Sequence, residues 1–166
     1  EFGVPGDTVI TTQYAGLGAM FSPNLYQNSL FFPDFNIDPS PYSLSNFQFI
    51  GGGPVVVPFL IFFSAVQTDA AFAMITNPNS TLFQSLLGGV VVDSGVLSTG
   101  FGSPTNFYGF TGVSFDEIRV KVGGDGAMIL DNLQLGSTGT VPEPASLLLL
   151  GFGLIGLAVS KMRKQN

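Results

Sequence analysis

The chain has 166 residues, of which 45% are hydrophobic and only 10% are charged, and it contains no histidine and no cysteine. Without these residue types it cannot form disulfides, zinc sites of the usual kind, or Ser/His and Cys/His nucleophile pairs. Residues 1–140 carry ten acidic and two basic side chains, a net charge of −8. That charge repels phosphate backbones, so we expect no nucleic-acid binding.

Residues 1–140 are rich in Phe, Val, Ile, Thr, Gly and Pro, which favours short strands over helices. In chain order, the apolar runs and alternations predict strands at 7–13, 19–22, 30–32, 44–49, 59–66, 70–76, 81–87, 90–93, 107–110, 114–122 and 126–135. Several short strands at this spacing predict one all-β domain over 1–140. We expect an antiparallel two-sheet sandwich of the jelly-roll kind, with closed arrangements of the strands as the alternative.

The segments between these strands carry three further predictions. The turn at 77–80 reads Asn-Pro-Asn-Ser and predicts a hairpin between 70–76 and 81–87. Residues 94–106 are expected to form a glycine-rich loop. Residues 23–43 are expected to form a long surface loop with only the short strand at 30–32 inside it. Its aromatic residues Phe31, Phe32 and Phe35 either present a contact patch or pack as the loop's own small core. The second alternative is favoured.

The last residues, 141–166, read VPEPASLLLLGFGLIGLAVSKMRKQN and differ sharply from the body. After a short linker at 141–144, residues 145–160 are apolar and would span roughly 24 Å as a helix. Lys161 and Met162 extend this run to 145–162, long enough for one C-terminal transmembrane helix. The basic end, with Lys161, Arg163 and Lys164, favours a cytoplasmic C-terminus at 163–166.

One face of this predicted helix is lined by small residues, which let helices approach closely in lipid. They are Ser146, Gly153, Gly156 and Ser160. This face is either a docking surface for a membrane-protein partner or a consequence of the high frequency of glycine in membrane helices.

The tail as a whole resembles the PEP-CTERM sorting signal of exported proteins of Gram-negative bacteria. The resemblance rests on Pro142, Glu143 and Pro144, followed by a Leu/Gly-rich span and a basic cluster. It implies recognition by an exosortase, cleavage near the Pro-Glu-Pro, and an N-terminal signal peptide. Because the sequence begins at Glu1 without an apolar leader, we expect that peptide to have been removed. Because the sequence includes the tail, we expect the tail to be retained.

The body also resembles exported bacterial β-sandwich domains, some carbohydrate-binding modules among them. The similarity lies in Ile10-Thr11-Thr12-Gln13-Tyr14, in residues 110–120 and in residues 129–133. In such domains an acidic residue near the first strand and an Asp in the last strand often share one structural calcium. The matching positions here are Glu1 or Asp7 with Asp131, whose carboxylates suit a hard cation. The alternative role for Asp131 is a hydrogen bond that caps the backbone.

These features together favour a non-catalytic protein. A pair of carboxylates can cleave glycosides, but the chain has no tryptophan, and the neighbouring Asp116 and Glu117 would point to opposite faces of a strand. We expect an accessory subunit of a larger inner-membrane complex, held by a single span with its body in the periplasm. The alternative is a sorted surface or extracellular-matrix protein with weak carbohydrate binding, which is extracellular once the tail is cleaved.

Overall fold

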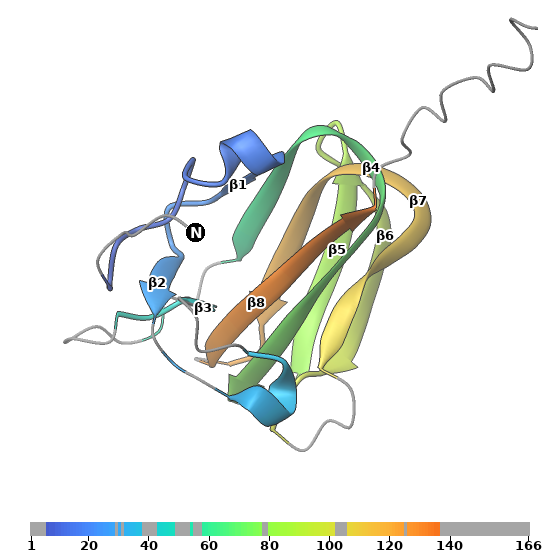
Figure 1. Ribbon diagram of the computed structural model, residues 1–166. Coiled ribbons are helices and arrows are strands. Elements are labelled where there is room, and N and C mark those ends of the chain that lie inside the picture. The colour runs from blue at the N-terminus through green and yellow to red at the C-terminus, as the bar shows by residue number, and fades with distance from the viewer. Residues whose placement is uncertain are drawn as a thin grey trace, which may run out of the picture.

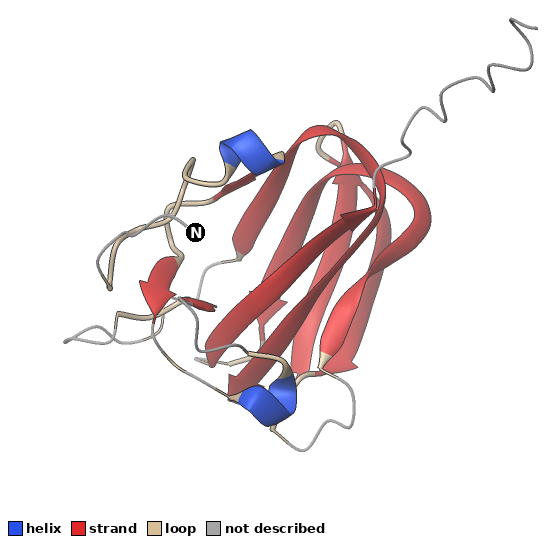
Figure 2. Cartoon of the chain, in the orientation of Figure 1, coloured by secondary structure: helices blue, strands red, loops and turns tan. Residues whose placement is uncertain are grey.

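The computed structural model describes residues 6–28, 30, 32–37, 43–48, 54, 58–77, 80–101, 106–124 and 126–136. Strands dominate these residues, and the two helices among them are short 3₁₀ turns (Figure 2). In chain order the elements are η1 (Ala15–Leu17), β1 (Ala19–Phe21), β2 (Tyr26–Asn28), η2 (Pro33–Phe35), β3 (Ser43–Ser45), β4 (Phe59–Asn77), β5 (Ser80–Leu87), β6 (Val90–Ser98), β7 (Phe107–Val122) and β8 (Ala127–Gly136). The predicted all-β body is confirmed.

All eight strands belong to one antiparallel hydrogen-bonded sheet. Their order is β2-β3-β8-β4-β7-β5-β6, and β1 pairs with β4 outside this path. The sequence predicted two separate sheets, and that part of the prediction is wrong. The body is nevertheless sandwich-like, because the single sheet doubles over on itself (Figure 1).

The doubling is made by the two longest strands, β4 and β7, which arch together from one layer into the other (Figure 1). Residues 59–62 of β4 pair with 117–120 of β7, and residues 69–73 pair with 107–111. Between these ladders the register shifts twice, between Phe62 and Gln67 and between Gln67 and Asp69. Such bulges let a strand turn a corner and continue into a second layer.

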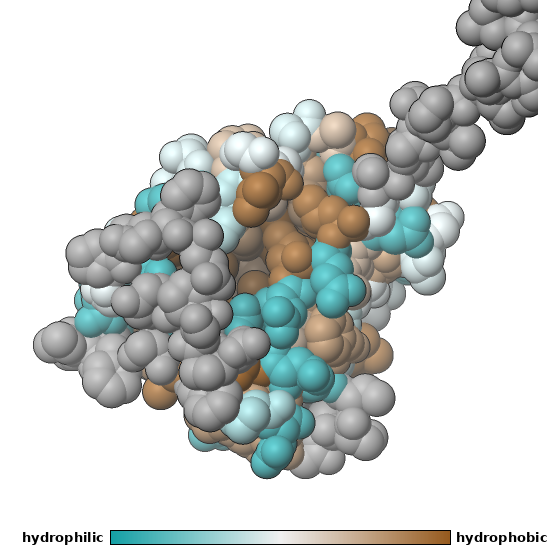
Figure 3. Space-filling model, viewed as in Figure 1, coloured by the Kyte–Doolittle hydropathy of each residue, from teal (hydrophilic) through white to brown (hydrophobic). Residues whose placement is uncertain are grey.

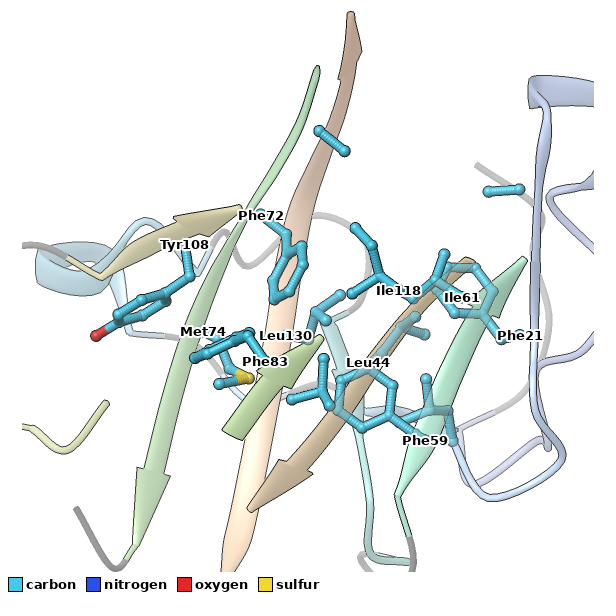
Figure 4. Packing of buried hydrophobic residues seen from close by; sticks show 14 of the residues in the cluster. Phe21, Leu44, Phe59, Ile61, Phe72, Met74, Phe83, Tyr108, Ile118 and Leu130 are labelled. Atoms are coloured by element: carbon cyan, nitrogen blue, oxygen red, sulfur yellow. The ribbon is translucent and has the colours of Figure 1, made fainter. Parts of the chain in front are cut away.

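The main core lies between the two layers. Phe59, Ile61 and Ile118 come from one layer, and Phe72 and Leu130 come from the other (Figure 4). These side chains are at most 2% exposed, and each contributes about 1.5–3 kcal/mol by leaving water.

A second, smaller apolar cluster covers the outer face of the β4–β8 ladder. Its buried members are Ile37, Ala73, Ile75 and Ile129, and Leu30, Phe32, Phe35 and Phe47 pack against them. Phe32 and Phe35 of the 23–43 loop therefore pack inward, as the favoured alternative predicted, but they pack onto the β4–β8 ladder as well as onto the loop's own Ile37. Phe31 lies outside the described residues.

Several predicted boundaries differ from the structure. The strands predicted at 59–66 and 70–76 are one strand, β4, and those at 107–110 and 114–122 are one strand, β7. Polar and glycine residues inside them bend the chain without ending its pairing. The 7–13 segment forms no strand, although it is hydrogen-bonded to the 25–27 segment and makes an isolated bridge from Val9 to Tyr26. β6 continues to Ser98, into the predicted glycine-rich loop.

The predicted hairpin across 77–80 is also wrong. β5 pairs with β7 and β6, while the second half of β4 pairs with β7 and β8. The tight hairpin is instead β5–β6, where Gly88 and Gly89 have φ of 57° and 80°. Two consecutive residues with positive φ match the turn that suits a two-residue hairpin loop.

Within the described part of the chain, no helix has the length and apolar character needed to cross a membrane. The predicted span at 145–162 and its basic end lie outside the described residues.

Candidate functional site

The two predicted calcium ligands within the described residues lie on different strands of the sheet. The backbone N–H of Asp7 donates to Gln27 O at 2.9 Å, which places Asp7 beside β2. Gln27 pairs with Leu44 of β3, and Leu44 pairs with Leu130 of β8, next to Asp131. Three strand spacings put Asp7 about 14 Å from β8. The third predicted ligand, Glu1, lies outside the described residues.

Asp131 instead has a visible local role. Its carboxylate accepts the backbone N–H of Asn132 at 2.7 Å, and Asn132 adopts a left-handed φ of 52°. The β4–β8 register shifts here, because Ala71 pairs with Gln134 and Ala73 with Asp131, so Asn132 and Leu133 face the one residue Phe72 and form a bulge. The described residues bring no three His, Cys, Asp or Glu side chains together as a metal site. Calcium binding therefore stays a prediction.

A cluster of amide side chains joins three distant segments beside this bulge. Asn132 Nδ2 donates to Asn36 O at 2.7 Å, and Asn36 Nδ2 donates to Asn106 Oδ1 at 2.9 Å. Asn106 is buried, and its Nδ2 has no hydrogen-bond partner among the described residues. Phe35, which precedes Asn36, packs edge-on against Phe101 with ring centroids 5.6 Å apart.

This amide cluster offers hydrogen-bond donors and acceptors beside an aromatic ring that is 49% exposed, that of Phe101. It contains no nucleophile and no general base, so it can bind a neutral polar group but has no means to cleave one. Sequence reasoning missed it because its members come from three separate segments. The usable signal was the asparagines themselves: Asn36 and Asn132 both adopt positive φ, which Asn tolerates better than most residues.

A second polar site lies where β4 and β7 bend. The Asp69 carboxylate accepts hydrogen bonds from the hydroxyls of Thr111 and Thr68, the latter at 2.7 Å. These bonds, the one from Thr111 first, hold the pKa of Asp69 below its ordinary value. Asp69 pairs with Gly136, the last residue of β8. This carboxylate therefore stays charged at the point where the described body ends.

The described body is thus an antiparallel all-β domain with an amide cluster and isolated, hydrogen-bonded carboxylates. The tail carries a separate signal, because residues 140–164 match the PEP-CTERM protein-sorting motif. The predicted sorting signal is confirmed. It is the signal of exported, membrane-associated proteins that exosortase sorts. A search of curated proteins found no match to this chain.

The match includes Pro142, Glu143 and Pro144 and the basic residues Lys161, Arg163 and Lys164. It also includes the small residues predicted to form a docking face, which are Ser146, Gly153, Gly156 and Ser160. All of these positions lie outside the described residues, so the docking face stays a prediction.

Proposed function

We propose that this protein is a non-catalytic exported domain, anchored in the inner membrane by its C-terminal segment, that acts by protein contact as an accessory subunit of a larger membrane complex. The observation that carries the proposal is a PEP-CTERM motif, with its apolar run and basic end, following the last strand of a β-sheet body. The positive-inside rule puts the basic end in the cytoplasm and the body in the periplasm.

The state of the body's carboxylates supports a contact role over a catalytic one. Asp116 accepts the Gly88 N–H at 3.1 Å through both oxygens, and Glu117 pairs with Arg119 at 3.2 Å. Asp69 and Asp131 are held by the hydrogen bonds described above. Each of these four carboxylates is engaged with a neighbouring group in the body, whereas acid–base catalysis by two carboxylates requires that they face one substrate.

Purification of the native protein from membranes in a mild detergent tests this proposal. We expect the chain to migrate as part of an assembly larger than a monomer, with other membrane proteins at constant stoichiometry. The variant Gly153→Leu with Gly156→Leu should release it, because bulky residues keep helices apart, while Leu150→Val should not. Migration as a lone monomer would contradict the subunit role.

The second candidate function is that of a sorted surface protein with weak carbohydrate affinity. The amide cluster beside the exposed ring of Phe101 favours it, since sugars are bound by amide hydrogen bonds and aromatic faces. In an NMR titration with neutral oligosaccharides, Phe101→Ala should abolish the shifts, and Leu97→Ala, a change at another exposed apolar residue, should not. Identical titrations of both variants would remove this candidate.

A further inference from the structure

One end of the body collects segments that are far apart in the sequence. Phe62, Glu117, Leu86 and Val91 pair in one row across β4, β7, β5 and β6. Beyond this row lie the bends of β4 and β7 and the β5–β6 turn. The η1 helix reaches the same place, because Ser64 N donates to Gly18 O at 3.0 Å.

The last strand finishes there as well, since Gly136 of β8 pairs with Asp69 in the β4 bend. We call this surface the bend end and define it as residues 15–18, 63–69, 87–91, 111–116 and 135–136. It is the upper end of the molecule in Figure 1.

Exposed apolar side chains gather at the bend end. Leu17 is 71% exposed, Val90 67% and Val66 49%, and Leu87 and Val91 are also exposed. These five account for nearly half of the large hydrophobic residues exposed in the described structure. Hydrophobic atoms also show at this end in the space-filling view, close to where β8 ends (Figure 3). Exposed apolar side chains scattered singly are ordinary, whereas a contiguous exposed apolar patch marks an interaction site.

The charges of the bend end indicate which partner fits. Its charged described residues are Asp69 and Asp116, and it has no basic side chain among the described residues. Both carboxylates are already hydrogen-bonded, Asp69 to two threonines and Asp116 to the Gly88 N–H. When these two carboxylates approach the lipid, fewer hydrogen-bonding atoms are therefore left without a partner than if the carboxylates were free. An apolar surface without basic groups suits a zwitterionic lipid surface and has no attraction for an anionic one.

The course of the chain places this surface next to the membrane. Residues 137–144 separate Gly136 from the apolar run that begins at Ala145. Fully extended, they span at most about 29 Å. If the tail is anchored as proposed above, on which this inference rests, the bend end is the part of the body tethered closest to the lipid.

We propose that the bend end is a membrane-contact surface, with Leu17, Val66 and Val90 inserted at the boundary between lipid headgroups and acyl chains. The contact fixes the orientation of the body on the bilayer. The amide cluster lies at the other end of the body, because Asn106 O accepts the N–H of Met74, close to the end of β4 at Asn77, whereas the bend lies in the middle of that strand. It therefore faces away from the membrane.

The absence of cysteine makes a labelling test direct. The full chain, reconstituted in phosphatidylcholine vesicles, carries one environment-sensitive fluorophore at Val90→Cys, Leu97→Cys or Leu150→Cys. Lipids with a nitroxide near the headgroup serve as the quencher. Val90 and Leu97 are both exposed and lie on the same strand, about 24 Å apart along it. We expect loss of fluorescence at positions 90 and 150 and none at position 97.

The outcomes separate this inference from the anchoring on which it rests. Quenching at position 150, with position 90 no more quenched than position 97, would overturn the membrane contact and leave the anchor intact. No quenching at position 150 would refute the anchor itself. A blue-shifted but unquenched label at position 90 would assign the surface to a second copy of the chain and also overturn the inference. Leu17→Ser should reduce quenching at position 90 in a chain with an unchanged circular dichroism spectrum.

Discussion

Replacing Gly109 with alanine tests the close pairing of β4 and β7 on which the doubled sheet depends. A Cβ at position 109 would lie 1.9 Å from Ala70 O and 2.7 Å from Ala71 Cα. Both atoms belong to the backbone of β4, so no side-chain rotation can relieve the clash. The paired strands would have to separate by more than about 1 Å, at a cost of about 3 kcal/mol, the upper part of the range for overpacking.

Thermal unfolding of the full chain in detergent, followed by far-UV circular dichroism, measures this cost. For a domain of this size, about 3 kcal/mol corresponds to a fall in Tm of roughly 10 °C. Gly95→Ala is the matched control, because its added Cβ meets nothing within 4 Å. It should be neutral or stabilise by up to about 1 kcal/mol. If Gly109→Ala melts with the wild type, the two strands do not approach as described and the reasoning fails.

Two further predictions concern individual carboxylates. Thr111→Val removes the first hydrogen bond to Asp69 and should raise the pKa of that carboxyl, as measured by NMR titration. Because the pKa of Asp69 is lower in the folded than in the unfolded chain, the wild type should be more stable than the variant at neutral pH. This difference in stability should vanish as the pH falls through the folded pKa. An unchanged pKa would exclude Thr111 as its cause. Asp93 is the charged residue of the exposed edge strand β6, and Asp93→Val should promote self-association in analytical ultracentrifugation more than Ser94→Val does. Equal association of the two variants would show that the charge is not what protects the edge.

The sequence was most informative where apolar alternation is local. The strands now seen as β5 and β8 were predicted nearly to the residue, and the tail motif was legible because its three parts are contiguous. Strand partners were not predictable from the sequence. The turn at 77–80 is typical of a hairpin, yet β5, which follows it, crosses to the other layer and pairs with β7. A turn signal reports local backbone geometry and carries no information about which distant strand is paired.

The bend end and the amide cluster were not predictable from the sequence for the same reason. Leu17, Val66 and Val90 belong to three distant segments, and they lie at one end of the body only because β4 and β7 bend there. The bends were not predictable either. Gln67 and Gly112 are residues typical of the gap between two strands, but they lie inside β4 and β7, where the strand bends and continues. The amide cluster likewise required the 23–43 loop to fold back onto β8.

The central claim is that the tail holds the body in the membrane. Its most direct test is the intact mass of the native protein recovered from alkaline-washed membranes and from the soluble and extracellular fractions. The account predicts that the membrane fraction contains a chain whose mass includes residues 141–166. Recovery of the protein in soluble or extracellular form, ending near Pro142-Glu143-Pro144, would contradict it.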